Sequence, residues 1–362
     1  MKLIACFIPS FDFGGAQLTT INLANSLIKD GNIKVDIIVC KAEGGLLALL
    51  DKKVNVVDLK CSKVYKSIFK IRKYIIHNKP DYFISHSDIP NLISLIVKFS
   101  IIRYSPKFII VQHNYYNIEI RSIKYVGKYI PFLIKHLYLK ADFIVAVSEG
   151  VKNSLNKQLK EKKTIQCIYN PINIQTIMDD SQLAIESELG DNFLLYVGRL
   201  EKVKNLYFLL DVFKEFLKYT PNYKLVIIGD GELKSSLINY ARSLYISDNV
   251  YFTGYRINPY NYIKRSSLIL STSFSEALPT IIVESMYFGK TVVSTPNKGA
   301  KELLNNGILG YLSSSFDNVD EFAQLIQEGL NTPIESMKLK EEFQNKFSSE
   351  KTVLKYKDLL QK

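Results

Sequence analysis

Residues 193–205 read F-L-L-Y-V-G-R-L-E-K-V-K-N, and this stretch predicts the architecture of the second half of the chain. The apolar run from Phe193 to Val197 has the length and composition of a buried strand. Gly198 permits a tight exit from that strand, and the following residues open a helix that we expect to run to about Thr220. A strand, a turn and a helix in this order form the repeating unit of a parallel sheet.

The same alternation of short apolar runs and helical patterns recurs along the whole chain. In the first half the predicted strands span residues 3–8, 35–40, 55–59, 81–86, 107–113, 142–148 and 164–169. In the second half they span residues 193–197, 223–230, 250–254, 267–273 and 291–296. Strands that alternate with helices predict parallel sheets covered on both faces, and 362 residues suffice for two such α/β domains.

A second stretch, E-A-L-P-T-I-I-V-E at residues 276–284, predicts a ligand site at the end of a strand. Pro279 suits the first turn of a helix, so Glu276 lies before that helix and Glu284 inside it. A rise of about 1.5 Å per residue separates the two acids by roughly 7 Å or more, which suits a sugar and a ribose better than one metal ion. The backbone N–H groups of residues 280–282 and the helix dipole favour phosphate. Taken alone, a solvated helix start with two surface acids explains the stretch equally well.

Arg199 and Lys204 flank the turn after the strand of residues 193–197. Both cations could converge on a diphosphate, Arg199 through its planar fork and Lys204 as a point charge, although either one alone could be an ordinary surface cation. In parallel α/β sheets, ligands bind beyond the carboxyl ends of the strands, and this turn and the 276–284 stretch both lie at such ends. The sequence therefore predicts that they form one site.

Four motifs together resemble the family 4 glycosyltransferases. They are V-G-R-L with Lys204, G-D-G-E-L at 229–233, F-T-G-Y-R at 252–256 and the E-x7-E pattern of 276–284. The resemblance spans the second half of the chain and implies the GT-B fold, in which two Rossmann-like parallel-sheet domains face each other across a cleft. It also implies retention of anomeric configuration, by a front-face displacement in which the donor phosphate helps to deprotonate the acceptor. Ala277 and Ser285 depart from the Gly and Ala usual in the family, so Ala277 carries strain if that position needs a positive φ.

The resemblance implies a role for each residue of the second-half site. Arg199 and Lys204 would neutralise the donor diphosphate, Glu276 would bind hydroxyls of the transferred sugar, and Glu284 would bind the ribose. We therefore name as candidate catalytic residues Glu276, Arg199, Lys204 and His113. The candidate donor-binding residues are Gly15, Ala16, Gly198, Tyr255, Arg256, Leu278, Pro279, Thr280, Ile281 and Glu284.

The first half contributes a glycine-containing turn and two histidines at strand ends. D-F-G-G-A at residues 12–16 is not the G-x-G-x-x-G dinucleotide fingerprint, but resembling proteins place this loop at the cleft, near the donor diphosphate or the acceptor. Resembling proteins also have a cleft histidine near the end of a strand, where it contacts the transferred sugar. By this resemblance His113, which lies at the end of a predicted strand, would have that role. A packing histidine is the alternative, and for His86 acceptor binding and packing both stay open.

The polar residues 172–191 carry no strand pattern and form the predicted linker. We expect an acceptor-binding domain at 1–171 and a nucleotide-sugar-binding domain at 192–340. The lysine-rich segment 341–362 is expected to be a helix that crosses back to the first domain, as is common in this fold.

The positive charge lies entirely in the first half, where residues 1–171 hold 26 Lys and Arg against 12 Asp and Glu. Within it an apolar helical stripe at Val64, Ile68, Ile71 and Ile75 opposes a basic stripe at Lys63, Lys66, Lys70 and Lys73. The segment 124–140 also mixes lysines with aromatic residues, among them Tyr125, Tyr129, Phe132 and Tyr138. An ordinary solvated face explains this pattern, and so does a face that docks on an anionic membrane. Each basic residue would then add about 1 kcal/mol to membrane binding. No recognised nucleic-acid motif accompanies the charge.

No Asp-x-Asp motif and no His or Cys pair with metal-ligand spacing occurs in the sequence, so we expect neither metal nor cofactor. No apolar run approaches 18 residues, the first residues do not read as a signal peptide, and the four cysteines are scattered. We therefore expect a cytoplasmic protein, peripheral on the inner face of the cytoplasmic membrane.

The sequence as a whole predicts a retaining glycosyltransferase. It would move a hexose or N-acetylhexosamine from a UDP-sugar, with a GDP-sugar as second choice. The acceptor would be a lipid-linked sugar or an oligosaccharide in lipopolysaccharide, capsule or oligosaccharide assembly. The alternatives are a nucleotide-sugar epimerase or glycosyl hydrolase of the same fold, and a non-enzymatic partner subunit that only binds nucleotide.

Overall fold

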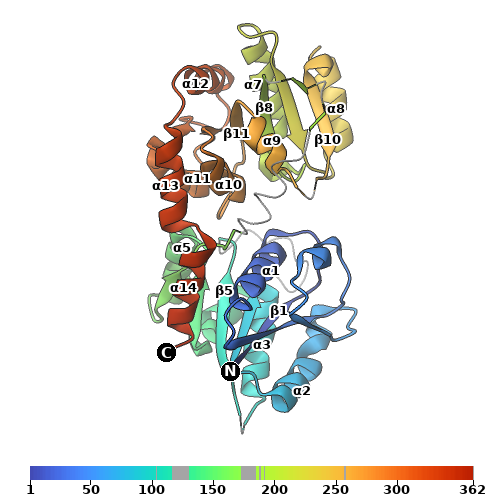
Figure 1. Cartoon of the computed structure of the whole chain (residues 1–362), viewed down its shortest axis with the longest axis vertical. Coiled ribbons are helices and arrows are strands. Elements are labelled where there is room, and N and C mark those ends of the chain that lie inside the picture. Colours follow the sequence, from blue (N-terminus) through green and yellow to red (C-terminus); the bar gives the residue numbers. More distant parts are fainter. Residues whose placement is uncertain are drawn as a thin grey trace. The chain divides into compact units, whose positions relative to one another are not determined.

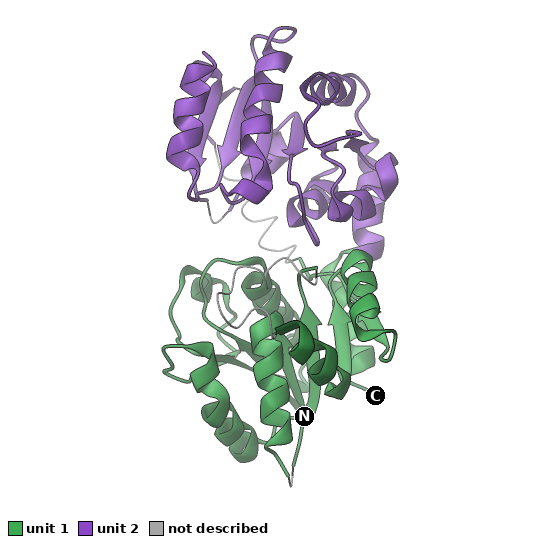
Figure 2. Ribbon diagram, turned by 180° about the vertical axis from the view of Figure 1, so that it is seen from behind, with its two compact units in different colours: residues 1–173, 347–362 green, residues 174–346 purple. Residues whose placement is uncertain are grey.

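The computed structural model describes residues 1–102, 104–115, 130–172, 185–186, 189–190, 192–256 and 258–361. They belong to two compact units, drawn in different colours in Figure 2. The first unit combines Met1–Asn173 with Phe347–Lys362, and the second is Ile174–Lys346. Each unit contains one parallel sheet with helices packed against it (Figure 1), which confirms the predicted α/β class with two Rossmann-like sheets.

The sheet of the first unit has the strand order β3-β2-β1-β4-β5-β6-β7, and every pairing is parallel. Its strands are β1 (Lys2–Ile8), β2 (Ile33–Val39), β3 (Asn55–Asp58), β4 (Tyr82–His86), β5 (Lys107–Gln112), β6 (Phe143–Ala146) and β7 (Ile165–Cys167). The first and last residues of each strand lie within two residues of the predicted bounds. The chain order reverses between β1 and β4, so the loops after these strands form the topological switch point, where α/β sheets bind ligands.

Helices cover this sheet and bury its aromatic residues. They are α1 (Gly15–Leu27), η1 (Gly45–Leu49), η2 (Val64–Ser67), α2 (Ile68–Asn78), α3 (Asp88–Phe99), α4 (Ile130–Leu137), η4 (Tyr138–Lys140), α5 (Glu149–Leu159) and α14 (Ser349–Leu359). Phe83 of β4 packs on Phe7 and Phe108 from the adjacent strands, in a cluster that includes Ile71 and Ile75 of α2. The apolar stripe predicted for α2 therefore faces the core, and its basic stripe faces solvent.

The C-terminal helix α14 belongs to the first unit (Figure 1). It contacts α1, Lys357 forms an ion pair with Asp30 at 2.6 Å, and the Tyr82 hydroxyl donates to the Leu360 carbonyl at 2.6 Å. The sequence predicts one helix from residue 341, whereas the structure has two, α13 (Ser336–Lys346) in the second unit and α14 in the first. The break falls at residues 347–348, where Ser348 caps α14 through its side chain.

The sheet of the second unit has the order β10-β9-β8-β11-β12-β13, again all parallel. Its strands are β8 (Phe193–Val197), β9 (Lys224–Ile228), β10 (Val250–Gly254), β11 (Leu268–Ser271), β12 (Val292–Ser294) and β13 (Tyr311–Leu312). The sequence analysis missed β13, because two residues are too short to show a strand pattern. Here the chain order reverses between β8 and β11, so the loops after these two strands form the switch point.

Helices also cover the sheet of the second unit. They are η6 (Lys202–Lys204), α7 (Leu206–Leu217), α8 (Lys234–Ser243), η7 (Ser247–Asn249), α9 (Tyr260–Arg265), α10 (Thr280–Phe288), α11 (Lys298–Leu303), η8 (Asn305–Gly307), α12 (Val319–Asn331) and α13. Of these, α7, α8 and α12 bury side chains in one apolar cluster with the strands. Most of the predicted linker 172–191 lies outside the described residues. In the described part of the chain, no helix is both long enough and apolar enough to cross a membrane.

Candidate functional site

The second unit brings two of its sequence motifs together at the switch point of its sheet. Lys204 lies on the connection after β8, and Glu276 lies on the loop between β11 and α10. Backbone groups fasten one connection to the other, because the Thr272 hydroxyl donates to the Lys204 carbonyl at 2.8 Å and the Phe274 N–H donates to the Val203 carbonyl at 2.9 Å. The parallel order of β8 and β11 thus joins residues that are far apart in sequence.

Lys204 and Glu276 form an ion pair between Nζ and Oε1, with both side chains less than one-fifth exposed. The Ser273 hydroxyl donates to the same Oε1 at 2.9 Å. At the backbone, the Gly299 N–H donates to the Glu276 carbonyl at 3.1 Å, and a Cβ on Gly299 would lie 2.7 Å from that oxygen. Glu276 is therefore held by its carboxylate and by its main chain, which fixes where it can meet a ligand.

Helix α10 begins beside this ion pair and offers an N-terminus without a side-chain cap among the described residues. The helix starts at Thr280, one residue later than predicted. Pro279 is therefore its N-cap and not its first helical residue. Of the three N–H groups expected to be free, that of Ile282 donates to the Pro279 carbonyl at 3.0 Å, which corrects the prediction. Thr280 and Ile281 keep the N–H groups that can receive phosphate. Leu278 is half-buried in the loop before them.

Glu284 lies on α10, where the surrounding protein desolvates its carboxylate and raises its pKa from 4.5 to about 7. No hydrogen bond or ion pair to another described residue compensates for this burial. Ala277 has a negative φ, so the strain considered from its departure from glycine does not arise. The other departure, Ser285, is buried and donates from its hydroxyl to the Ile281 carbonyl at 2.6 Å.

Arg199 does not share a partner with Lys204 in this structure. Its side chain is 72% exposed and pairs with Glu201 at 2.8 Å. Arg256 pairs with Glu186 at 2.6 Å, and the Tyr262 hydroxyl donates to the other oxygen of Glu186 at 2.5 Å. Two of the predicted donor-site cations therefore hold neighbouring carboxylates, and their role toward a donor stays a prediction.

The turn after β8 depends on two glycines whose backbones touch. The Gly198 N–H donates to the Ile228 carbonyl at 2.9 Å, which continues the pairing of β8 and β9. Gly229 has a φ of +148°, and a Cβ there would lie 1.9 Å from the Gly198 carbonyl oxygen. The strict glycine requirement therefore falls on Gly229, which the sequence analysis noted only as part of a motif.

Tyr255 follows β10 and is 47% exposed. The buried part of the residue raises the pKa of its hydroxyl.

The first unit places its candidates on the loops after β1 and β5. Gly15 and Ala16 begin α1, an N-terminus that no described side chain caps. His113 directly follows β5, and its Nε2 lies 2.9 Å from Nδ1 of His86 at the end of β4. Burial lowers the pKa of His113 to about 4, and burial together with His113 lowers the pKa of His86, so both rings are neutral at pH 7.

Thr272 and Ser273 are site residues that the sequence analysis missed. They belong to the polar run S-T-S at residues 271–273, which begins with the last residue of β11. Such a run at a strand end was a readable signal, because short hydroxyl side chains there can bond to neighbouring loops. Among the residues that the structure describes, no group of three or more His, Cys, Asp or Glu side chains could hold a metal ion.

Two Rossmann-like parallel-sheet units, one with an acid, a cation and a helix N-terminus at its switch point, define the GT-B class of glycosyltransferases. Residues 179–346 match the model of glycosyl transferases group 1, and residues 13–176 match that of glycosyltransferase family 4. The chain belongs to the family 4 glycosyltransferases. This membership disfavours the epimerase, hydrolase and non-enzymatic alternatives.

Several relatives support the same family. The chain is 28% identical to an N-acetylgalactosamine-N,N'-diacetylbacillosaminyl-diphospho-undecaprenol 4-alpha-N-acetylgalactosaminyltransferase of Campylobacter jejuni, over 96% of this chain and 94% of the relative. It is 32% identical to an uncharacterised glycosyltransferase of Methanocaldococcus jannaschii, over 67% of this chain and 62% of the relative. The crystal structure of Anabaena HepE in complex with UDP shares the fold, with a TM-score of 0.83, 18% identity and full coverage of both chains.

Proposed function

We propose that this glycosyltransferase moves a hexose or N-acetylhexosamine from a UDP-sugar to a lipid-linked or saccharide acceptor, with retention of anomeric configuration. The observation that carries the proposal is the meeting of Lys204, Glu276 and the N-terminus of α10 at one switch point. UDP is favoured over GDP because HepE, which shares the fold, was crystallised with UDP. A lipid-linked acceptor is favoured by the Campylobacter relative, whose name specifies a diphospho-undecaprenol acceptor.

The chemistry of the site fits the breaking of a bond between a sugar and a phosphate. As the C1–O bond to the diphosphate breaks, negative charge builds on the leaving oxygen, and Lys204 and the α10 amides stabilise that charge more in the transition state than in the ground state. Glu276 accepts hydrogen bonds from hydroxyls of the transferred sugar, and Glu284 accepts them from the ribose. The acceptor oxygen bonds to C1 from the same face, and its proton passes to the leaving phosphate. No step calls for a metal.

The first unit carries a surface that suits an anionic membrane. Phe69 of α2 is 82% exposed, and the exposed Lys66 and Lys73 lie three residues before it and four residues after it, on the same helix face. Further exposed apolar residues lie on η2, α2 and α3 and just after α3, namely Tyr65, Ile76, Ile96, Phe99 and Ile102. An aromatic residue among lysines combines insertion into the interface with attraction to anionic headgroups, at about 1 kcal/mol per basic residue.

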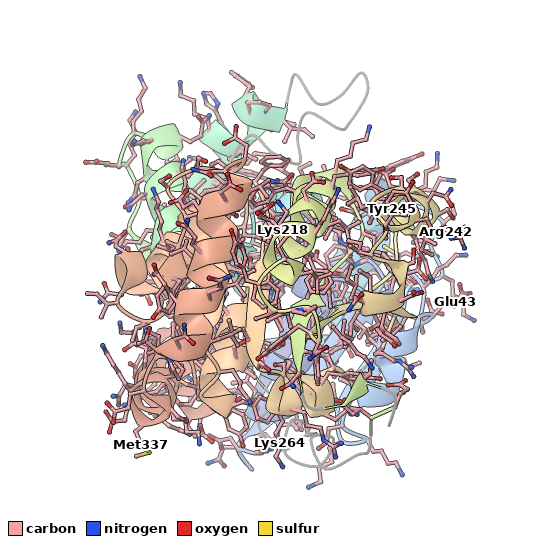
Figure 3. All side chains as sticks on the ribbon, turned by 90° about the horizontal axis from the view of Figure 1, so that it is seen from above. Glu43, Lys218, Arg242, Tyr245, Lys264 and Met337 are labelled. Atoms are coloured by element: carbon pink, nitrogen blue, oxygen red, sulfur yellow. The ribbon has the colours of Figure 1, made fainter. Side chains whose placement is uncertain are left out.

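Within the described residues, the exposed apolar side chains of η2, α2 and α3 lie on elements that pack against one another. Exposed apolar residues of the second unit include Tyr245 after α8 and Met337 on α13, which lie on separate elements (Figure 3). In the predicted second basic segment, Phe132 is exposed on α4 and Tyr138 is fully buried, while residues 124–129 lie outside the described residues. We infer that the α2 face, defined as Tyr65, Lys66, Phe69 and Lys73, brings the enzyme to membrane-linked acceptors on the cytoplasmic side.

The donor assignment is tested by incubating the protein with UDP-glucose, UDP-N-acetylglucosamine, UDP-N-acetylgalactosamine and GDP-mannose, with and without an undecaprenyl-diphosphate-linked sugar. Transfer to the acceptor, with the anomeric configuration read by NMR, supports the proposal. A donor that is epimerised or hydrolysed without acceptor would contradict it. Glu276→Gln should abolish transfer, whereas Glu341→Gln, an exposed acid on α13, should leave it unchanged.

Membrane docking is tested by sedimentation with phosphatidylcholine vesicles that contain or lack phosphatidylglycerol. Removing two lysines through Lys66→Gln and Lys73→Gln should weaken binding to anionic vesicles about 30-fold, at about 1 kcal/mol per charge. Lys264→Gln, an exposed cation on α9 of the second unit, is the matched control. Equal binding of neutral and anionic vesicles, or an equal effect of Lys264→Gln, would exclude the α2 face as an electrostatic docking surface.

A further inference from the structure

Two buried histidines meet beside the switch point of the first sheet, and the family resemblance assigned a role to only one of them. His86 ends β4, which borders the reversal of strand order, and His113 follows the neighbouring strand β5. Their exposed fractions are 1% and 8%. Nδ1 of His86 lies 2.9 Å from Nε2 of His113, within hydrogen-bonding distance, so the two rings share one proton along this line.

Neighbouring residues fix the two strand ends that carry the rings. Ser87, directly after His86, has a φ of +75° and a ψ of 162°, a conformation that costs a non-glycine residue free energy and recurs at functional sites. The Ser87 N–H donates to the Val111 carbonyl of β5 at 3.1 Å, which ties the end of β4 to the strand before His113. Gln112, beside His113, donates to the Asp88 carboxylate at 2.7 Å.

Either ring can donate the shared proton, and the burial of His86 Nε2 decides between these two arrangements. Nε2 of His86 is fully buried and has no hydrogen-bond partner within the described residues. If His113 donated the shared proton, the proton of neutral His86 would sit on this Nε2 as a buried N–H group without an acceptor, which proteins strongly avoid. If His86 donates, Nε2 is only an unused acceptor. The second arrangement is therefore favoured.

His113 is then left with one usable atom. Its Nε2 accepts from His86, so its own proton is on Nδ1, and Nδ1 has no partner among the residues that the structure describes. A neutral imidazole with N–H at Nδ1 is a hydrogen-bond donor at that atom. Sugar hydroxyl and ring oxygens are acceptors for such a group.

We propose that His86 is a positioning residue that donates from Nδ1 to Nε2 of His113, fixes the proton of His113 on Nδ1, and so presents a donor to an oxygen of the transferred sugar. The ligand in this proposal rests on the proposed function, but the tautomer does not. The two parts can therefore be tested separately.

The tautomer is read directly by long-range proton–nitrogen NMR of the full chain labelled with 15N-histidine at pH 7.5. The four histidines are assigned through single substitutions at His77, His86, His113 and His136. We expect His113 to be protonated at Nδ1 in the wild type and in His86→Gln, whose amide can donate in place of the imidazole. In His86→Phe the Nδ1 tautomer should give way to a mixture. Protonation of wild-type His113 at Nε2 would overturn the proposal.

Kinetics then separate positioning from packing. His86→Phe should lower kcat/KM for the donor about fivefold, the effect of one neutral hydrogen bond, and His86→Gln should restore most of it. Equal loss in both variants would indicate packing only and overturn the proposal, as would full activity of His86→Phe. His77→Gln, an exposed histidine on α2, is the control. If His86→Phe does not fold, the wild-type and His86→Gln spectra decide the tautomer. A wild type that transfers no sugar refutes the proposed function, while the spectra still decide the role of His86.

Discussion

Replacing Glu284 by glutamine should stabilise the free protein above pH 7 while weakening its binding of nucleotide. The carboxylate lies on α10 without a hydrogen bond or ion pair to another described residue, and burial raises its pKa from 4.5 to about 7. At 1.36 kcal/mol per pKa unit, the ionised side chain costs the folded protein about 3 kcal/mol. Glutamine has the same shape and no charge, so the variant should recover most of this free energy.

The stability gained by Glu284→Gln should depend on pH and grow as the pH rises. Between pH 4.5 and about 7 the folded protein holds a proton on Glu284 that the unfolded chain has already released. Stability therefore falls as the pH rises through this window, and the full loss persists above it. Glu284→Gln should match the wild type below pH 4.5 and exceed it most at pH 8, where the melting temperature of a unit of this size should rise by about 6 °C or more.

The assay is thermal unfolding followed by circular dichroism at several pH values from 4.5 to 8, with Glu341→Gln on α13 as the control. A parallel titration with the UDP-sugar donor at pH 8 should show Glu284→Gln binding about fivefold more weakly, because a hydrogen bond to a charged carboxylate becomes one to a neutral amide, a loss of about 1 kcal/mol. A variant that gains no stability at pH 8 would refute the desolvation of Glu284. A variant that is stabilised but binds donor like the wild type would refute its role toward the ribose.

Three further outcomes are expected. Lys204→Met should lower kcat about 100-fold or more with a small change in KM, measured by steady-state kinetics, because it removes the cation at the leaving phosphate. Gly229→Ala should destabilise the second unit by more than about 2 kcal/mol in urea unfolding, since its Cβ would lie 1.9 Å from a carbonyl oxygen, whereas Gly15→Ala has open space at its Cβ and should be nearly neutral. Lys357→Ala should cost at most about 1 kcal/mol in the same assay, because its ion pair with Asp30 is partly exposed.

Strand positions were readable because they depend on local patterns. A buried parallel strand is a short apolar run with turn residues at its ends, so β8 and β10 were predicted with their correct bounds and the other longer strands within two residues. The E-x7-E motif and the turn after β8 were readable for the same reason. The two-residue β13 was not, and the start of α10 was misplaced by one residue because proline suits both the N-cap and the first turn.

Contacts between distant residues required the tertiary structure. Local sequence placed Lys204 and Glu276 at strand ends, but their ion pair depends on β8 and β11 being neighbours, and on Thr272 and Phe274 joining the two loops. It placed His86 and His113 at the ends of separate strands, and only the pairing of β4 with β5 put one ring against the other. Apolar periodicity is a property of neighbours along the chain, whereas strand order, partner choice and desolvation arise when the whole sheet packs.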